Sequence, residues 1–377
     1  MGIKRMIVAV LLGTVLVAQG IEVPRWQQAE PGYNWSFPRD LYAHSEYKTE
    51  WWYVTGHLAA VDEADSELAF QLTFFRIGIQ EPDSLSTQSA WRADDLVMAH
   101  AALMDSKTGE HIFSEVVWRA TPFLGGFGDV GDSTLAWCQA PPGTDAQWRL
   151  EYQDGEFLLS VEDARQDLKY DLRCRPTQEP VLHGESGYSR KSEDGKAASL
   201  YFSQTRMEVS GTVDRKGRAV PVTGESWLDR EMFTSTLGEG QKGWDWLSLQ
   251  LDDGRELMLY RLLAEDGSAD YAMGTMVGPD GKVTLLTEKE WQLKPTSYWT
   301  SPETEARYPV AWSLDVPGRD VSMDLEAMIP EQENVSKLTG IHYWEGAVRA
   351  KERGNQSQTG RGFVEMTGYG KGSRPPV

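Results

Sequence analysis

Acids and tryptophans alternate closely in one segment of the second half of the chain. Residues 224–231 include Trp227 and, two positions later, Asp229. A carboxyl group that indole rings shield from water can stay protonated near neutral pH and donate that proton. The same residues allow a structural alternative, in which Asp229 pairs with Arg230, or Glu231 with an arginine, at a domain junction. A proton-donating site and an ion pair are therefore both open here.

A second acid lies among aromatic residues near the start of the chain, where Glu50 precedes Trp51, Trp52 and Tyr53. On a strand, Trp51 and Tyr53 share one face, and Glu50 and Trp52 share the other. For Glu50 this leaves two alternatives: the side chain faces solvent, or it is a buried acid whose pKa is raised by desolvation.

Aromatic residues are abundant throughout, with 15 Trp and 14 Tyr in 377 residues. Aromatic side chains favour strands and fill the cores of large sheets. They also line cavities that take up large apolar ligands. Both roles stay open for any single tryptophan, including Trp344, which lies in one of two segments (342–348 and 362–369) that we expect to be closing strands.

Several classes of function are excluded by missing motifs and by charge. The chain has no Walker A loop and no Gly-rich dinucleotide fingerprint, and the string Gly184–Gly187 has the wrong spacing for a nucleophile elbow. Six histidines occur without an HExxH motif, so we expect neither a metal nor another cofactor. The formal net charge of −20 disfavours nucleic acid as a partner.

The chain contains two cysteines, Cys138 and Cys174. In an oxidising compartment they could form one disulfide, since both lie in the first half of the chain. Whether they meet depends on the distance between their Cα atoms, which the sequence does not give. Paired and free cysteines stay open as alternatives.

The hydrophobic pattern has a period of two almost everywhere. Leu68, Phe70, Leu72 and Phe74 alternate with other residues, and similar runs recur to residue 329. Strict alternation indicates strands with one buried face, and the Asp-Gly pairs between the runs suit tight hairpin turns. Residues 244–262 show the clearest hairpin. Antiparallel strands joined by short turns predict an all-β sandwich or barrel.

The N-terminus has the pattern of a secretory signal peptide. Lys4 and Arg5 precede a short apolar run and small residues before Ile21, so we expect residues 1–20 to be removed on export to the periplasm or beyond. An uncleaved anchor is the alternative. The remaining chain is long enough for two domains, and a polar, Gly-containing stretch at 211–218 suggests boundaries of 21–215 and 216–377.

Six of these segments occur in the same order in a known family. The chain resembles the AttH-like/carotenoid 1,2-hydratase family of lipocalin-like proteins through Thr49–Gly56, Ala99–Leu103, Ser226–Asp229, Gly243–Trp246, Leu251–Tyr260 and Tyr343–Gly346. The resemblance implies two consecutive lipocalin-like β-domains with a ligand cavity. The candidate ligand-binding residues are then Glu50, Trp51, Trp52, Tyr53, His100, Tyr201, Trp244, Trp246 and Trp344.

For the hydratase branch, the resemblance also implies a reaction. Protonation of a trisubstituted alkene gives a tertiary carbocation that water captures, which needs an acid in a dry pocket and aromatic faces around the cation. Trp227 and Asp229 fall where that branch has its catalytic aromatic residue and acid. Two features differ from the family pattern: Ser199, Leu200 and Tyr201 replace an upstream His/Trp pair, and Arg230 replaces a histidine. A cation next to Asp229 would favour its ionised form.

Three hypotheses about function follow. The leading one is an exported carrier or sensor of a hydrophobic molecule (a lipid, an isoprenoid or a polyene), linked to an inner-membrane ABC transporter. The second is a hydratase or related lyase that uses Asp229 as its acid, with Trp227, Trp244 and Trp246 around the cation. The third is a structural surface protein whose tryptophans only pack cores.

Overall fold

The computed structural model of the protein describes residues 26–370, except 64–66, 82–88, 90, 236 and 355–357. The predicted signal peptide (1–20) lies outside the described residues. The described regular elements are β-strands and two single-turn 3-10 helices, η1 (Arg39–Leu41) and η2 (Pro317–Arg319), which confirms the all-β prediction. Within the described residues, no helix has the length and apolar character needed to cross a membrane.

The strands form two antiparallel sheets. The first has 13 strands in the order β4-β3-β2-β1-β13-β12-β9-β8-β7-β6-β5, and β10 and β11 pair with β12. Its strands are β1 (Thr49–Ala60), β2 (Glu67–Gly78), β3 (Asp95–Asp105), β4 (Glu110–Arg119), β5 (Gly125–Phe127), β6 (Thr134–Gln139), β7 (Gln147–Gln153), β8 (Glu156–Asp163), β9 (Leu168–Pro176), β10 (Val181–Leu182), β11 (Tyr188–Arg190), β12 (Ala198–Arg215) and β13 (Arg218–Ser235).

The second sheet has 10 strands in the order β17-β16-β15-β14-β23-β22-β20-β19-β18, and β21 pairs with β22. Its strands are β14 (Gln241–Leu251), β15 (Glu256–Ala264), β16 (Ala269–Val277), β17 (Val283–Thr287), β18 (Gln292–Thr300), β19 (Arg307–Val316), β20 (Val321–Ala327), β21 (Glu333–Val335), β22 (His342–Glu352) and β23 (Gln358–Thr367). The hairpin predicted for residues 244–262 is confirmed as β14 and β15.

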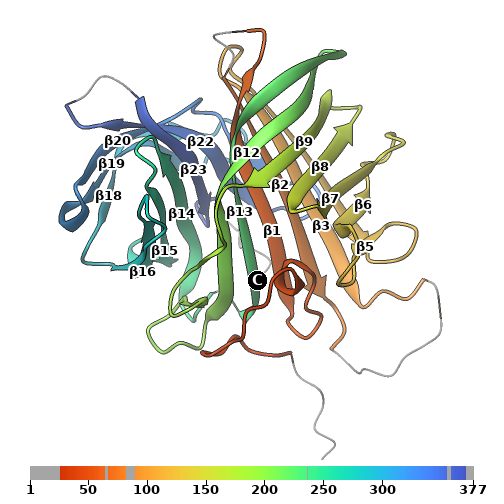
Figure 1. Ribbon diagram of the computed structural model, residues 1–377, viewed down its shortest axis with the longest axis horizontal. Helices are drawn as coiled ribbons and strands as arrows, with labels where there is room; N and C mark the ends of the chain where they lie inside the picture. The colour runs from red at the N-terminus through yellow and green to blue at the C-terminus, as the bar shows by residue number, and fades with distance from the viewer. Residues whose placement is uncertain are drawn as a thin grey trace, which may run out of the picture.

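The first sheet curls into a nearly closed barrel, in which β3 approaches β6 and β4 approaches β9. The second forms a half-barrel beside it (Figure 1). Each has its own apolar core: Phe74, Trp148 and Leu228 pack inside the first, and Leu247 and Trp312 inside the second. Two consecutive β-halves are therefore present, as the sequence predicts.

The change from one sheet to the other falls between Ser235 at the end of β13 and Gln241 at the start of β14. The stretch 211–218, at which the sequence suggested a boundary, forms the hairpin between β12 and β13 inside the first sheet. Because β13 pairs with β1 as well as with β12, the sheet needs this strand at its centre.

The central strands of both sheets are buried on both faces. In β1, Trp52 and Val54 point into the barrel core, whereas Tyr53 joins an apolar cluster that also contains Trp246 of β14. The outer faces of the two sheets therefore pack against each other in the middle of the molecule, where β1, β13, β14 and β23 lie (Figure 1). Neither face of these strands meets bulk water. Successive side chains therefore alternate between a barrel core and the interface between the sheets.

The two cysteines are free and buried. Cys138 lies on β6 and Cys174 on β9, and β7 and β8 separate these strands in the sheet. Three strand spacings of about 4.8 Å exceed the Cα separation that a disulfide allows. Of the two alternatives left by the sequence, the structure has the unpaired one.

Candidate active site

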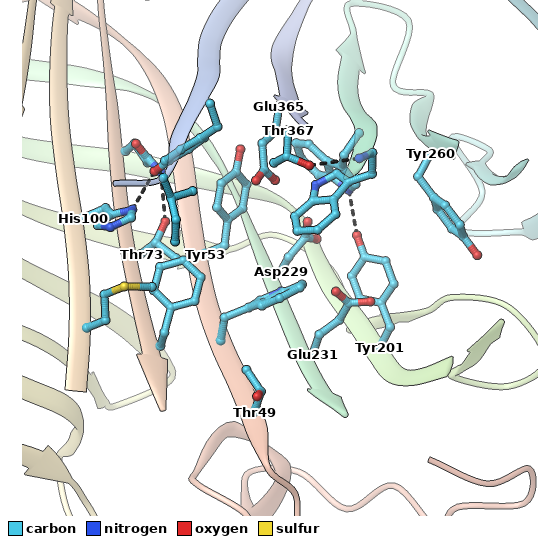
Figure 2. A pocket seen from close by; sticks show the side chains of 18 of the residues that line it. Thr49, Tyr53, Thr73, His100, Tyr201, Asp229, Glu231, Tyr260, Glu365 and Thr367 are labelled. Atoms are coloured by element: carbon cyan, nitrogen blue, oxygen red, sulfur yellow. Dashed lines mark hydrogen bonds between the residues drawn. The ribbon is translucent and has the colours of Figure 1, made fainter. Parts of the chain in front are cut away.

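A cavity of about 90 Å³ lies between the two sheets. Strands β1, β2, β3, β12 and β13 of the first sheet and β14, β15, β22 and β23 of the second contribute to its wall (Figure 2). On this measure of volume, one water molecule needs about 10–15 Å³, so the cavity has room for several waters or one slender organic group. We call this cavity the chamber.

Asp229 lies on the chamber face of β13 and is buried. Its Oδ1 atom accepts hydrogen bonds from the Trp227 indole (2.6 Å) and from the Ser203 hydroxyl. Burial raises the pKa of Asp229 to about 7, and hydrogen bonds with Ser203, Trp227 and Tyr201 offset only part of that rise. Because Oδ1 accepts the bonds from Trp227 and Ser203, the proton of the neutral acid belongs on Oδ2.

Arg230 does not influence Asp229 in the way that the sequence suggested. Successive side chains on a strand point to opposite faces, so Arg230 lies inside the first barrel. There it pairs with Glu50, which also binds Arg76 (2.5 Å), and the Arg230 guanidinium lies 4.0 Å from the centre of the Trp52 ring. The predicted effect of Arg230 on Asp229 is therefore wrong, and so is the alternative of an ion pair between them.

Glu50 matches neither of its two predicted states. It is fully buried, and although burial alone would raise its pKa, Arg230 and Arg76 hold the pKa well below its usual range. It also accepts a hydrogen bond from the backbone N–H of His44 at 2.8 Å. Glu50 is therefore an ionised member of the barrel core rather than a ligand-binding residue.

A chain of hydrogen bonds supports Asp229 from behind. Ser203, which donates to Asp229, lies 2.6 Å from Nε2 of His183, and Nδ1 of His183 lies 3.0 Å from the Thr275 hydroxyl. Burial lowers the pKa of His183 to about 3, so its ring is neutral. A neutral ring that donates from Nε2 leaves the Ser203 proton for Asp229, which keeps Oδ1 in its accepting role.

Glu231 lies two residues after Asp229 on the same face of β13. It pairs with Lys191 at 2.8 Å and accepts a hydrogen bond from Ser199 at 2.6 Å. The Lys191 ammonium also lies 4.2 Å from the centre of the Tyr260 ring. The first sheet thus offers the chamber an acid with a raised pKa and, next to it, a glutamate paired with a lysine.

The second sheet contributes two more acids, Glu345 and Glu365, which are cross-strand neighbours. Burial raises the pKa of Glu365 to about 8 and, together with the nearby Glu365, raises that of Glu345 well above its usual range. Tyr53 of the first sheet donates a hydrogen bond to Oε1 of Glu345 at 2.5 Å. Both acids are therefore protonated at neutral pH.

Aromatic rings surround these polar groups. Trp51 and Trp244 both line the chamber, with ring centres 6.3 Å apart, and Tyr53 meets Trp246 edge to face at 5.2 Å. Trp246 donates a hydrogen bond from its indole to the Tyr201 hydroxyl at 3.0 Å. The electron-rich faces of such rings stabilise a cation in a dry cavity.

Most of the predicted site residues meet at the chamber. Trp51, Tyr53, His100, Tyr201, Asp229, Trp244 and Trp246 line it. Trp227 lies behind Asp229 as its hydrogen-bond donor. Trp52 and Trp344 do not reach the chamber, because their positions alternate with chamber-facing neighbours and point into the two barrel cores.

The sequence analysis did not select Glu231, Lys191, Ser203 or Glu365, which also belong to this site. A signal for Glu231 was present, since Trp227, Asp229 and Glu231 are spaced by two and so share a face. No such signal exists for Lys191, which reaches the chamber from a short turn after β11. Among the described residues, no group of three or more His, Cys, Asp or Glu side chains could hold a metal ion.

Comparison with known proteins identifies a matching family and several structures of similar fold. A family model described as AttH-like matches residues 28–369. A crystal structure of an AttH candidate from Nitrosomonas europaea is 31% identical, with a TM-score of 0.77, and the alignment covers 91% of this chain and 99% of that one. The crystal structure of kievitone hydratase from Nectria haematococca is 14% identical with a TM-score of 0.63, over 88% and 91% of the two chains, which shows a shared fold.

Among curated proteins, the dehydratase asqC of Emericella nidulans is 22% identical over 231 residues. The match spans 58% of this chain and 59% of that enzyme, a little over half of each.

Proposed function

The chain belongs to the AttH-like family, and we propose that it is a hydro-lyase, which adds water to a carbon–carbon double bond or removes it, with Asp229 as the proton donor. The observation that carries this proposal is the state of Asp229: a buried carboxyl group with a raised pKa, whose Oδ1 accepts two hydrogen bonds, in the wall of an aromatic chamber. An acid with a pKa near the working pH suits proton transfer to carbon.

In the hydration direction, the Asp229 proton passes to the less substituted carbon of the alkene. The π electrons form the new C–H bond, and the other carbon becomes a carbocation next to Trp51, Trp244 and Trp246. A cation of this kind gains from aromatic faces and from the lack of competing water around it. Asp229 is left as a carboxylate, which Ser203 and Trp227 already solvate with their hydrogen bonds.

In this proposal Glu231 completes the reaction as the base. The Cα atoms of Glu231 and Asp229 are about 7 Å apart along the strand, and the attacking water is proposed to lie between the two carboxyl groups. As this water attacks the cation, Glu231 takes one of its protons and the C–O bond forms, giving an alcohol. The proton then returns to Asp229, so the net change is alkene plus water to alcohol, and dehydration is the reverse.

The relatives support this catalytic hypothesis better than the carrier hypothesis, since two of them are named as a hydratase and a dehydratase. The relation to the dehydratase covers only part of each chain. Export by a signal peptide and a link to an ABC transporter stay predictions from the sequence.

A direct test uses a panel of acyclic terpene alkenes and prenylated phenols, together with the matching tertiary alcohols, in water enriched in oxygen-18. We expect the wild type to form labelled alcohol from at least one alkene, or to dehydrate the alcohol. Asp229→Asn should lower this rate by roughly 10²–10⁴-fold, the usual contribution of a general acid. Asp171→Asn, an exposed change on β9, is the matched control.

Two results would overturn the proposal. One is turnover that survives unchanged in Asp229→Asn. The other is a wild type that converts no member of the panel in either direction.

A further inference from the structure

His100 lies in the chamber wall at the far end from Ser203, in one row with Asp229. The register across the first sheet pairs His100 of β3 with Thr73, Thr73 with Tyr53, and Tyr53 with Asp229. These four residues therefore point to the same side of the sheet, and Figure 2 shows His100 and Asp229 on either side of Tyr53. Three strand spacings put their Cα atoms about 14 Å apart.

A directed hydrogen-bond network assigns the proton on the His100 ring. Asn334 donates from its amide nitrogen to Oε1 of Gln71 (3.0 Å), and Gln71 therefore presents its own amide nitrogen to the Tyr343 hydroxyl (3.2 Å). Tyr343 accepts that bond, which leaves its O–H to donate to Nδ1 of His100 at 2.7 Å. The ring is neutral, because burial lowers the pKa of His100 to about 3. Its single proton is therefore on Nε2.

The Nε2 atom of His100 has no hydrogen-bond partner among the described residues, although it is buried. The rings of Phe75 and Phe113 lie 5.3 Å from the imidazole, and that of Tyr343 stacks on it at 5.6 Å. None of these rings offers a strong acceptor. A buried N–H without an acceptor is destabilising, so proteins seldom keep one that a ligand or water does not satisfy.

We propose that Nε2 of His100 binds an acceptor oxygen of the substrate, and that the substrate is therefore an apolar alkene or alcohol with a carbonyl or hydroxyl oxygen remote from the reacting carbon. The second half of this statement rests on the proposed function. The Cα atoms of His100 and Asp229 are about 14 Å apart, and because both side chains stand on the same side of the sheet, their functional groups are separated by a similar distance. The hydrogen bond at His100 and the proton-transfer contact at Asp229 take up part of it. The bound oxygen and the reacting carbon are then on the order of 10 Å apart.

This spacing discriminates between classes of substrate. A β-hydroxy carbonyl compound has its oxygen only two or three bonds from the reacting carbon, which is too close for both residues to be used at once. A pure hydrocarbon leaves the His100 N–H unsatisfied. An isoprenoid chain that ends in a ketone, alcohol or phenol fits both ends of the row.

The test measures binding, with geranylacetone as the probe and the hydrocarbon that has CH2 in place of its carbonyl as the matched ligand. Trp51, Trp244 and Trp246 line the chamber, so quenching of tryptophan fluorescence reports occupancy. We expect the wild type to prefer the ketone and His100→Phe to lower the ratio of the two affinities by roughly tenfold, the value of one hydrogen bond with its buried partner.

Two variants keep the result interpretable. In His100→Gln, the side-chain amide can accept from Tyr343 and donate to the ligand, so the preference for the ketone should survive. His100→Phe combined with Tyr343→Phe also removes the hydroxyl that would lose its acceptor, and it should match the single variant. Unchanged hydrocarbon binding in each variant shows that the chamber is intact.

An affinity ratio that is the same in the wild type and in His100→Phe would overturn the proposal, because water alone would then satisfy Nε2. Failure of the wild type to bind either probe would also overturn it. Since turnover is not measured, the outcome is independent of Asp229→Asn: a His100-dependent preference stands even if the hydro-lyase proposal fails.

Discussion

The two faces of the central strands bury acids in opposite ways. Inside the first barrel, Glu50 is fully buried and ionised, because Arg76 and Arg230 bind it. On the chamber side, Asp229 is as deeply buried and its pKa is raised to about 7. Glu50 lies on β1 and Asp229 on the neighbouring strand β13, so the two acids share a sheet and are both buried. Their partners differ: two guanidinium groups bind Glu50, whereas an indole N–H and hydroxyl groups bind Asp229.

This comparison separates stability from chemistry. A buried ion pair with several hydrogen bonds is costly to break, since removal of one partner leaves a charge without solvent. A buried protonated acid would release its proton at neutral pH in water, but desolvation keeps the proton on it in the chamber. One face of the sheet thus fixes the fold, and the other has the reactive proton.

The largest effect on stability should follow from breaking the ionised cluster. Glu50→Gln leaves Arg230 buried without its counter-charge and Arg76 with Asp95 alone, and we expect a loss of about 3–5 kcal/mol in the free energy of unfolding. Urea denaturation measures it. Glu208→Gln removes an exposed ion pair with Arg175 and should change little. Similar stabilities of the two variants would contradict the assigned role of Glu50.

The two faces should also respond to pH in opposite directions. The folded state keeps a proton on Asp229 that the unfolded state releases above a pH of about 4, so raising the pH to about 8 should lower stability by on the order of 4 kcal/mol through this group. Asp229→Asn removes this loss and should flatten the decline between those pH values. Glu50, whose pKa is lowered, contributes stability at neutral pH that is lost on acidification.

Urea unfolding at about pH 5 and about pH 8 measures this contrast. Parallel pH dependences of the wild type and Asp229→Asn would show that Asp229 is ionised in the folded protein, and the distinction between the faces would fail.

Turnover itself should depend on the protonated form of Asp229. We expect the rate to be high below a pH of about 7 and to fall about tenfold for each further pH unit, as the acid loses its proton. The pH profile of kcat on any substrate found in the panel measures this. A rate that rises through the same range would identify Asp229 as a base instead.

The smallest effect should come from the indole next to the acid. Trp227→Phe removes a hydrogen bond that lowers the pKa of Asp229, so this pKa should rise by less than about one unit. The midpoint of the kcat profile would then move to higher pH. Trp52→Phe, a change on the core face, should leave that midpoint in place, and an equal shift in both variants would contradict the separation of the two faces.

Local patterns were sufficient for the strands and for part of the site. The period of two predicted the hairpin from Trp244 and also the opposite faces of Trp51 and Trp52. It did not show which face was the interior, because both faces carry large side chains and neither meets solvent. Applied to Asp229 and Arg230, the same period would have separated them, whereas their adjacency in sequence suggested an interaction.

The remaining errors concern partners that come from distant strands. The state of Glu50 depends on Arg76 of β2 and Arg230 of β13, which only the register of the sheet brings together. The proton on His100 depends on Tyr343 of the second sheet. The register of the first sheet brings Arg76 and Arg230 to Glu50, and the packing of the two sheets brings Tyr343 to His100. Neither arrangement can be inferred from local patterns in a single sequence.

Each sheet is built from one continuous stretch of the chain, and this has a consequence for folding. The strands of the first barrel all precede Ser235 and those of the second all follow Gln241, so each core can form from one uninterrupted stretch of chain. The chamber then arises only when the two halves dock, and this step removes Asp229, Glu345 and Glu365 from water together. Docking at neutral pH must therefore take up protons from solution, which makes alkaline conditions slow or reverse the last stage of assembly before either barrel loses its core.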